Sequence, residues 1–361
     1  MSVAMASLKK LLKFITEEHG TLTREQARTT LTAFLTGETS DLEIAALLSA
    51  MATRGESADE LTGFAEALRT LAVPVPLTEE ERANLVDTCG TGGDGLGTFN
   101  ISTGAALVAA AAGAKVAKHG NRGVTSKCGS ADVLEAMGVS VALTPEQSVA
   151  CLRATGFTFL YAPALHPAMK HVQPVRKALG FRTIFNLAGP LTNPAGARAQ
   201  VMGVFSGSRL TVVAEAMARL GVRHAFVVHG GDGLDELSLT DESSVAEVQN
   251  QEIGNSEQGT DSSVRVFKFS PEDAGLQRCS LEALRGGETA AENAAILERI
   301  FDGELEPKRD IVLLNAAAAL VACGLASDFK EGIARGAEAI DSHAVRKTLS
   351  MLREFSRTVN V

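Results

Sequence analysis

A glycine-rich segment between Asp87 and Thr103 carries the residue types best suited to binding a phosphate group. Its sequence is DTCGTGGDGLGTFNIST, with five glycines in the eight positions from Gly90 to Gly97. Several backbone N–H groups of such a loop can converge on one anion, because glycine tolerates the positive φ angles that this requires. The segment is therefore predicted to cradle a phosphate.

The same segment has the spacing Gly90-x-Gly92-x-x-Gly95 after a short predicted strand at 84–87, which would also suit a dinucleotide-binding fold. In that fold a helix opens within the motif, and an acidic residue about 20 positions later binds the ribose hydroxyls. Here more loop follows, and no Asp or Glu occurs from Gly95 to Ala131. The glycines are expected to serve a different phosphate, and a dinucleotide-dependent oxidoreductase is the least favoured interpretation.

Acidic residues are absent from two long tracts of a chain whose net charge is -9. The tracts run from Gly95 to Ala131 and from Gln147 to Ala214, and both contain several Lys, Arg and His residues. Buried alanine-rich helices explain part of this absence, but not the basic residues that flank them. If both tracts line one cleft, its positive potential would gather anionic small molecules.

A second polar segment, from Lys118 to Ser130, follows a predicted strand at 113–117 and precedes a helix that begins at Ala131. It would lie on a loop at the carboxyl end of a strand, where open α/β sheets bind ligands. A solvated basic loop is the alternative, but glycine, asparagine and hydroxyl residues interleave with the cations as in anion-binding nests. His119 alone would be weak support, because single histidines are more often structural.

Asp235 and Glu236 are adjacent carboxylates on a predicted loop after a strand at 225–229. Mg²⁺ prefers oxygen ligands and commonly bridges one or two carboxylates to substrate phosphates. In isolation a surface acidic turn is the better interpretation, and only the predicted phosphate cradle favours magnesium. Asp241 and Glu242 are expected to be solvated.

Arginines and tight turns lie near a predicted helix in the segment from His166 to Pro194. The helical pattern at 165–180 persists despite Pro174. Arg176 could hold a carboxylate through two parallel hydrogen bonds. Without further context it could equally be a surface salt-bridge partner.

The elements that position these residues begin with a run of helix signals. An amphipathic segment at 7–15 is followed by four capping boxes, which start at Thr23, Ser40, Ser57 and Thr78. The predicted helices carry apolar residues at helical spacing and should bury one face in a bundle. We predict a small all-helical domain at residues 1–82, joined by about 165–195.

Short β-branched runs then alternate with helical stretches, which predicts a mostly parallel sheet with helices on both faces. The predicted strands are 113–117, 139–143, 157–161, 200–205, 225–229 and 264–269. The stretch 249–263 is expected to be an exposed loop, and the pattern is helical again from 288 onward. Residues 83–361 therefore form a larger α/β domain in this interpretation.

Composition limits the class of protein. The chain has 361 residues, 45% of them hydrophobic, and can bury a substantial core. Its five cysteines show no paired spacing, which favours a reducing compartment, and no apolar run is long enough to span a bilayer. We expect a cytoplasmic protein that binds neither nucleic acid nor membrane.

Five motifs in order, together covering nearly the whole chain, resemble the anthranilate phosphoribosyltransferase family of tryptophan biosynthesis. They are Gly90–Asp94, Asn100–Thr103, Lys118–Arg122, Asp235–Glu236 and the segment from His166 to Pro194. The resemblance implies a nucleoside phosphorylase-like fold, in which a helical domain forms a homodimer and ligands bind between it and the α/β domain. Thr125, Cys128, Gly123 and Ala188 depart from the usual family pattern, and Cys128 is a poor hydrogen-bond partner where serine is common.

The resemblance implies transfer of the phosphoribosyl group of 5-phosphoribosyl 1-pyrophosphate to the amine of anthranilate, with release of pyrophosphate, as the second step of tryptophan biosynthesis from chorismate. It assigns Mg²⁺ to Ser102, Asp235 and Glu236, and catalytic roles to Lys118 and Arg176. Anthranilate would lie beside Gly90, His119, Asn121, Arg176 and Pro190. The phosphoribosyl donor would be held by Gly90, Gly93, Asp94, Thr98, Asn100, Ile101, Ser102, Thr103, Lys118, His119, Gly120, Asn121, Arg122, Gly123, Val124, Thr125, Ser126 and Ser130.

The chemistry of this reaction is consistent with these residue types. Departure of pyrophosphate from the sugar leaves charge that cations and magnesium stabilise, and a neutral aromatic amine needs no strong general base. Two alternatives stay open. A pyrimidine nucleoside phosphorylase-like enzyme would share the plan but should lack the Asp235–Glu236 pair, and a non-catalytic ribose-phosphate binder would bind without turnover.

Overall fold

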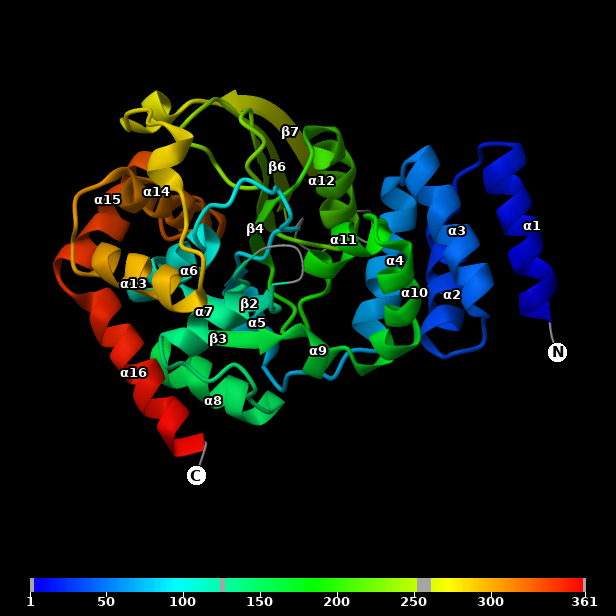
Figure 1. The fold of residues 1–361 in the computed structure, drawn as a ribbon, viewed down its shortest axis with the longest axis horizontal. Coiled ribbons are helices and arrows are strands. Elements are labelled where there is room, and N and C mark those ends of the chain that lie inside the picture. Colours follow the sequence, from blue (N-terminus) through cyan, green and yellow to red (C-terminus); the bar gives the residue numbers. More distant parts are fainter. Residues whose placement is uncertain (1–2, 124–126, 252–260, 360–361) are drawn as a thin grey trace.

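The computed structural model describes residues 3–123, 127–251 and 261–359, and it has helices at both ends of a twisted sheet. Figure 1 shows the first four helices gathered at one end of the molecule and the last four at the other, with the sheet between them. This is the predicted combination of a small helical part and a larger α/β part. None of the helices in these described ranges is long and apolar enough to cross a membrane.

The N-terminal helices begin where the capping boxes predicted. At Thr23, Ser40, Ser57 and Thr78 the hydroxyl accepts from the backbone N–H three residues later, and the side chain there accepts from the cap backbone. Each box satisfies N–H groups that a helix start leaves without partners. The helices are α1 (Val3–Glu17), α2 (Arg24–Leu35), α3 (Asp41–Arg54), α4 (Ala58–Thr70) and α5 (Glu79–Ala83).

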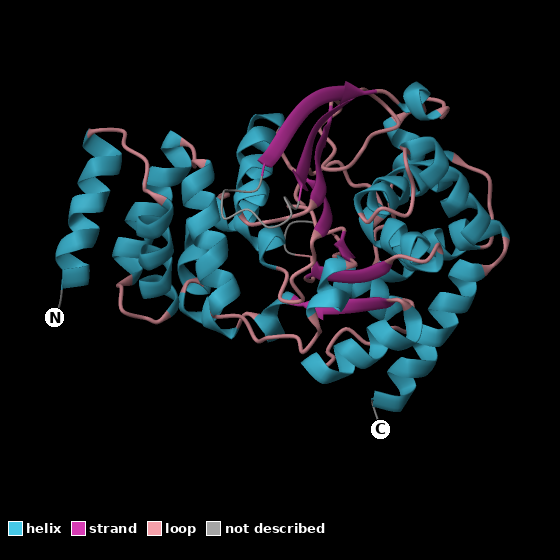
Figure 2. Ribbon diagram, turned by 180° about the vertical axis from the view of Figure 1, so that it is seen from behind, coloured by secondary structure: helices cyan, strands magenta, loops and turns pink. Residues whose placement is uncertain are grey.

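Seven strands form one sheet in the order β3-β2-β1-β4-β5-β6-β7. Figure 2 shows this sheet from behind. The pairs from β3 to β5 are parallel, whereas β5–β6 and β6–β7 are antiparallel. The strands are β1 (Leu85–Asp87), β2 (Lys115–Gly120), β3 (Phe157–Tyr161), β4 (Ala199–Gly203), β5 (His224–Gly230), β6 (Ser243–Gln251) and β7 (Asp261–Phe269). The mostly parallel sheet is confirmed.

Two predictions about the strands were wrong. The predicted strand at 139–143 is irregular, because this segment pairs with no strand among the described residues. It packs Val139 and Val141 into the core under α16 (Ala344–Val359) instead. The predicted loop at 249–263 contains the end of β6 and the start of β7, which pair through Gln249–Ser263 and Asn250–Ser262. Residues 252–260 lie outside the described residues.

The remaining helices follow α5 along the chain. They are α6 (Ile101–Ala111), α7 (Ser130–Ala136), α8 (Pro145–Thr155), α9 (Ala162–Leu165), α10 (Gln173–Leu179), α11 (Ile184–Ala188), α12 (Leu210–Arg219), α13 (Ala290–Phe301), α14 (Pro307–Ala322) and α15 (Phe329–Asp341). Short 3₁₀ helices are η1 (Pro167–His171), η2 (Gly189–Thr192), η3 (Gly207–Arg209), η4 (Pro271–Ala274) and η5 (Leu281–Leu284). The predicted helix at 165–180 is thus split into η1 and α10, because Pro167 and Pro174 each begin a new helix.

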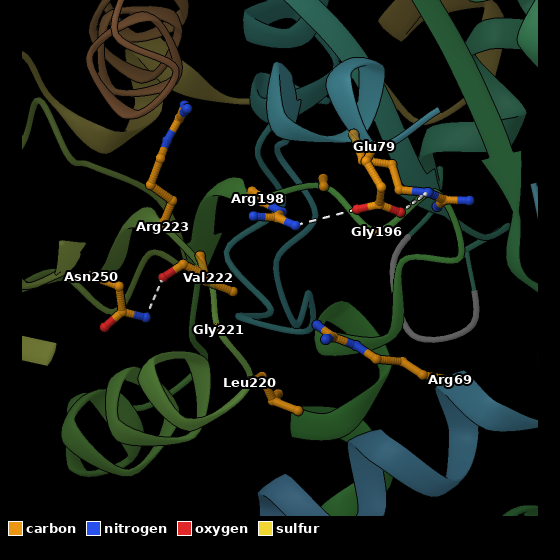
Figure 3. A pocket seen from close by; sticks show the side chains of 11 residues that line it. Arg69, Glu79, Gly196, Arg198, Leu220, Gly221, Val222, Arg223 and Asn250 are labelled. Atoms are coloured by element: carbon orange, nitrogen blue, oxygen red, sulfur yellow. Dashed lines mark hydrogen bonds and ion pairs between the residues drawn. The ribbon is translucent and has the colours of Figure 1, made fainter. Parts of the chain in front are cut away.

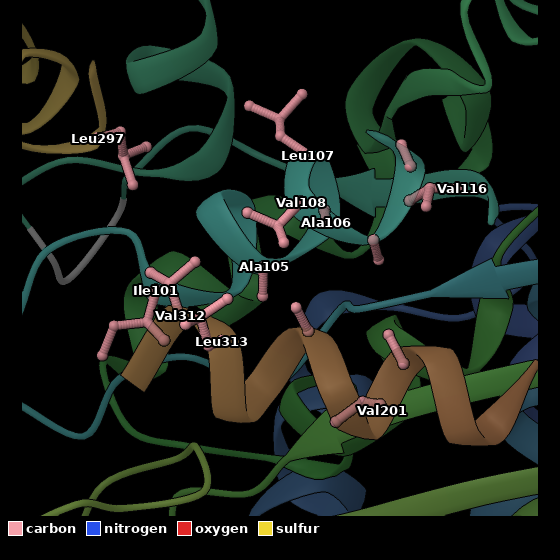
Figure 4. Packing of buried hydrophobic residues seen from close by; sticks show 14 of the residues in the cluster. Ile101, Ala105, Ala106, Leu107, Val108, Val116, Val201, Leu297, Val312 and Leu313 are labelled. Atoms are coloured by element: carbon pink, nitrogen blue, oxygen red, sulfur yellow. The ribbon is translucent and has the colours of Figure 1, made fainter. Parts of the chain in front are cut away.

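Successive residues of the central strands contact two different cores, as the alternation of side chains along a strand requires. Val201, Phe226 and Val228 lie in a cluster with α6, α13 and α14, part of which is shown in Figure 4. Their neighbours Met202 and Val227 lie in a second cluster that contains α12 and the N-terminal helices. The sheet is therefore covered on both faces.

The segment at 165–195 packs against the N-terminal helices. Val172, Val175, Phe185 and Leu191 are buried in the same cluster as Phe64 of α4. The Phe64 and Phe185 rings meet edge to face with their centres 5.9 Å apart. This packing supports our proposal that 165–195 joins the helical domain of residues 1–82, with 83–361 forming the rest.

Candidate active site

Lys118 is buried at the end of β2 and points toward the start of the glycine-rich segment. Its Nζ lies 2.9 Å from both the carbonyl oxygen and the Oγ1 of Thr88, and 3.4 Å from the Oγ of Ser102. Lys118 and His119 belong to the strand rather than to the predicted loop, because parallel pairing with β3 continues to Gly120. The ammonium group is thereby fixed between the two ends of the segment that was predicted to bind phosphate.

The glycine-rich loop has the backbone that was expected of a phosphate cradle. Gly92, Gly93, Gly95 and Gly97 have φ angles of 64°, 84°, 77° and 72°, which other residues rarely adopt. Thr91 fixes the start of the loop, since its N–H donates to the Gly203 carbonyl at 2.9 Å. Phosphate binding by this loop stays a prediction, but the loop's conformation is the one that the prediction requires.

Three backbone segments meet at Gly90, Gly203 and Asp235 with no room for side chains between them. A Cβ atom on Gly90 would lie 2.9 Å from the Gly203 carbonyl oxygen, and a Cβ on Gly203 would lie 1.5 Å from the Asp235 carbonyl oxygen. The end of β4 thus separates the glycine-rich loop from the loop of the predicted metal ligands by one layer of backbone. Their relative position is set by these two contacts.

The N-terminus of α6 faces the same point. Asn100 is its N-cap residue, and the Ser102 N–H donates to Glu236 Oε1 at 3.2 Å. The Asn100 Oδ1 is buried without a hydrogen-bond partner among the described residues. The helix dipole makes such a terminus favourable for an anion. Ile101 and Thr103 are buried in this first turn.

Three carboxylates gather beside this helix end. Burial raises the pKa of Asp235, and the nearby charge of Asp94 raises it further. The pKa of Glu236 is also raised, by burial first and then by Asp235, while Lys118 opposes the shift. Crowded carboxylates of this kind favour a divalent cation, which would relieve both burial and repulsion.

The carboxylates and Ser102 fit a magnesium ion that is completed by substrate. In the ranges that the structure describes, no group of three or more His, Cys, Asp or Glu side chains could hold a metal ion by itself. Mg²⁺ usually keeps several waters and binds through one or two carboxylates plus phosphate oxygens. Ser102, Asp235 and Glu236 could supply the protein's share of such a site.

Asp87 is a buried site residue that the sequence reasoning missed. Its carboxylate accepts from the His119 N–H at 3.1 Å and from Asn193 Nδ2 at 2.8 Å. Burial raises its pKa to about 6, although the nearby Lys118 charge opposes this. The sequence signal for Asp87 was its place at the end of a strand, three positions before Gly90.

His119 and His166 form a buried pair between the α/β part and the segment at 165–195. Their ring centres are 5.1 Å apart in an edge-to-face arrangement. Burial lowers the pKa of His119 to about 3 and that of His166 to about 4. Both imidazoles are therefore neutral at physiological pH.

Arg176 projects from α10 without a carboxylate partner among the described residues. Its guanidinium lies 5.0 Å from the centre of the Phe185 ring, and Nη1 is 3.4 Å from Gln173 Oε1. Burial lowers its pKa. A partly buried arginine without a counter-ion in the described part of the chain is suited to receive a carboxylate ligand. Pro190, another predicted contact, is buried in η2.

Several predicted donor contacts have partners within the protein, and their role in donor binding stays a prediction. Arg122 forms ion pairs with Glu135 and Asp132. Ser130 Oγ donates to the Asn121 carbonyl at 3.3 Å, and Gly123 N–H donates to Asp132 at 2.8 Å. Thr98 forms a bridge to Arg285. Val124, Thr125 and Ser126 lie outside the described residues.

The departure at Cys128 leaves a backbone contact with Asn100 in place. The Cys128 carbonyl accepts a hydrogen bond from Asn100 Nδ2 at 3.1 Å. Burial raises the pKa of this thiol to about 11. A serine at this position is therefore not required for the contact with Asn100.

A separate cavity of about 490 Å³ opens near the amino ends of β4 and β5 (Figure 3). It is lined by Arg69, Arg82, Arg198, Arg223 and Glu79, among others. Arg198 and Arg223 directly precede these two strands, whereas Gly203 ends β4 at the opposite edge. The cavity is therefore distinct from the candidate active site.

The sequence matches both domains of one glycosyl transferase family. Residues 8–72 match the helical bundle domain of a glycosyl transferase family, and residues 82–345 match its a/b domain. The fold and the site thus define a glycosyl transferase with these two parts.

Relatives narrow this class. The chain is 48% identical over 349 residues to an anthranilate phosphoribosyltransferase of Symbiobacterium thermophilum, covering 97% of this chain and 98% of the relative. It is 49% identical to that of Solibacter usitatus over 98% of this chain and 99% of the relative. This chain belongs to the anthranilate phosphoribosyltransferase family, which confirms the resemblance inferred from the motifs.

Solved structures agree with this assignment. The anthranilate phosphoribosyltransferase of Thermus thermophilus has a TM-score of 0.86 and 43% identity, covering 97% of this chain and 99% of that one. The enzyme of Saccharomyces cerevisiae in complex with PRPP and Mg has a TM-score of 0.85 and 26% identity, with 98% of each chain covered. The predicted fold class is therefore confirmed.

Proposed function

We propose that this protein transfers the phosphoribosyl group of 5-phosphoribosyl 1-pyrophosphate to the amine of anthranilate in a magnesium-dependent reaction. One observation carries the proposal. Ser102 lies within 3.4 Å of Lys118 Nζ through its hydroxyl, and its N–H lies 3.2 Å from Glu236. A cation, a helix N-terminus and a predicted metal ligand thus meet at one residue, as a diphosphate with bound Mg²⁺ requires.

On the donor side, we assign the diphosphate to the glycine-rich loop and the start of α6. Lys118 would stabilise the negative charge that grows on the leaving pyrophosphate, since its ammonium is buried and already oriented. Asp235, Glu236 and Ser102 would hold Mg²⁺, which when bound would neutralise further charge on the leaving group. Neither step needs a nucleophilic side chain.

On the acceptor side, we assign the anthranilate carboxylate to Arg176. Binding the carboxylate there would orient the ring so that its amine faces the anomeric carbon. His119 and His166 would line this path as neutral, buried groups. The amine is uncharged at neutral pH and loses its proton readily once the bond to carbon forms, so that positioning replaces a strong base.

The test is a fluorescence assay of purified protein with phosphoribosyl pyrophosphate, anthranilate and magnesium. We expect anthranilate fluorescence to fall, and the rate to vanish with a chelator and return with added Mg²⁺. A pyrimidine nucleoside phosphorylase-like enzyme would instead cleave a nucleoside with inorganic phosphate and without magnesium. Donor binding without turnover would indicate a ribose-phosphate binder, and either result would refute the proposal.

We further propose a homodimer through the helical part and a cytoplasmic location. Leu42 on α3 is 80% exposed, and Leu8, Leu11 and Leu12 of α1 are only partly buried. An apolar surface of this kind favours contact with a second copy. Light scattering should give the mass of a dimer, and Leu42→Lys should shift it toward the monomer.

A further inference from the structure

Arg182 joins three segments that are distant in the sequence. It lies on the loop between α10 and α11, and its Nη2 donates a hydrogen bond to the carbonyl of Gly93. Its guanidinium carbon is 4.4 Å from the centre of the Phe205 ring, just beyond β4. The Phe205 N–H in turn donates to Thr91 Oγ1 at 3.0 Å. The acceptor-side segment is thereby connected to the glycine-rich loop at its centre.

The carbonyl that Arg182 holds belongs to the peptide unit between Gly93 and Asp94. In a planar trans peptide the C=O and the N–H point in opposite directions. Gly92 and Gly93 are conformationally permissive, with φ angles of 64° and 84°, and cannot fix this unit by their own preferences. The hydrogen bond from Arg182 therefore turns the Asp94 N–H toward the opposite side of the loop.

We propose that Arg182 is a positioning residue that holds the Asp94 N–H toward the diphosphate of the donor. The inference rests on the proposed function, and it adds a residue on the acceptor side that acts on the donor side. Arg176 lies in α10, and Arg182 lies in the loop that follows this helix. In this proposal Arg176 binds the acceptor directly, whereas Arg182 orients a backbone N–H group that binds the donor.

The test compares three variants by calorimetric titration of phosphoribosyl pyrophosphate with Mg²⁺ in the absence of anthranilate. Arg182→Met keeps an alkyl chain for Phe205 and removes the donors, Arg182→Lys keeps a charge and one donor group, and Lys177→Met is the control. Lys177 is exposed on α10, and its replacement removes the same charge. We expect donor affinity to fall about tenfold in Arg182→Met, about 1.4 kcal/mol, to recover partly in Arg182→Lys, and to stay unchanged in Lys177→Met.

Steady-state kinetics provide a second measurement. The KM for the donor should rise in Arg182→Met, while the KM for anthranilate stays within twofold of the parent value. Unchanged donor affinity, or an equal loss in Lys177→Met, would overturn the proposal. So would a joint loss of both substrate affinities with a lower melting temperature, because that is the result of a merely structural contact. If the parent binds the donor but forms no product, the proposed function fails while the effect of Arg182 remains measurable.

Discussion

The substitution Gly203→Ala should disable the enzyme without unfolding it. The φ angle of Gly203 is not positive, so alanine can adopt its backbone conformation. The new Cβ would nevertheless lie 1.5 Å from the Asp235 carbonyl oxygen. Ordinary contacts begin near 3.4 Å, so the loop that holds Asp235 and Glu236 must retreat by about 1.9 Å, the difference between these distances.

A displacement of about 1 Å in a catalytic group can cost about 100-fold in rate. We therefore expect kcat/KM to fall at least 100-fold in Gly203→Ala, about 2.7 kcal/mol of transition-state stabilisation. The apparent magnesium constant should rise, because the carboxylates move away from Ser102. Gly90→Ala should have a smaller effect, since its Cβ would lie 2.9 Å from the Gly203 carbonyl oxygen and needs a shift of only about 0.5 Å.

The assay follows anthranilate fluorescence at several magnesium concentrations, with circular dichroism and thermal unfolding to verify the fold. Gly207→Ala is the matched control, because Gly207 lies in η3, its φ is not positive, and its Cβ would first meet the His229 side chain, at 3.1 Å. If Gly203→Ala kept activity within twofold of the parent, or if Gly207→Ala lost as much, the backbone stack would not determine the position of the metal ligands.

Three further predictions concern charge. Arg176→Ala should raise the KM for anthranilate at least tenfold and leave the KM for the donor nearly unchanged, in steady-state kinetics; the reverse pattern would exclude its carboxylate role. Lys118→Met should lower kcat by 100-fold or more with an intact circular dichroism spectrum, and a loss confined to KM would contradict the charge-stabilising role. In urea titrations from pH 7 to 5, His119 and His166 should each lower the free energy of unfolding as the pH falls, because their folded-state pKa values, about 3 and about 4, lie below about 6.5 in the unfolded chain. The carboxyl groups of Asp87, Asp235 and Glu236, whose pKa values are raised by burial, act in the opposite direction and are the same in the parent and in a histidine variant. Each histidine contributes about 1.4 kcal/mol per pH unit once pH is below 6.5, so His166→Gln should remove about that much of the slope, and an unchanged slope would show that this ring is not buried in its neutral form.

Local signals predicted much of the fold. The boxes at Thr23, Ser40, Ser57 and Thr78 work through residues three positions apart, so the sequence alone locates these helix starts. β6 was missed because six of the nine residues in its sequence, SSVAEVQNQ, are polar. Antiparallel pairing on both sides stabilises this strand. The β-branched run at 139–143 was mistaken for a strand because propensity does not reveal whether a pairing partner exists.

The candidate site was predictable to the extent that it follows strand ends. Lys118 and the glycine-rich segment converge because β1 and β2 are parallel neighbours, whose carboxyl ends lie at one edge of the sheet. The contact between Asp87 and Asn193 joins residues 106 positions apart and depends on how η2 packs, which no local pattern encodes. The contact of Arg182 with a backbone carbonyl leaves no trace in the sequence for the same reason.

The alternation of side chains along the central strands also limits how the chain could be divided. Met202, Val227 and Ala246 on one face share a cluster with Phe34, Leu48 and Phe64. A fragment that starts at residue 83 would lose those aromatic and aliphatic neighbours, and the apolar face of its sheet would be exposed to water. We therefore expect this fragment to aggregate when it is expressed alone. The N-terminal helices and the sheet should therefore be kept together in any truncation or domain exchange.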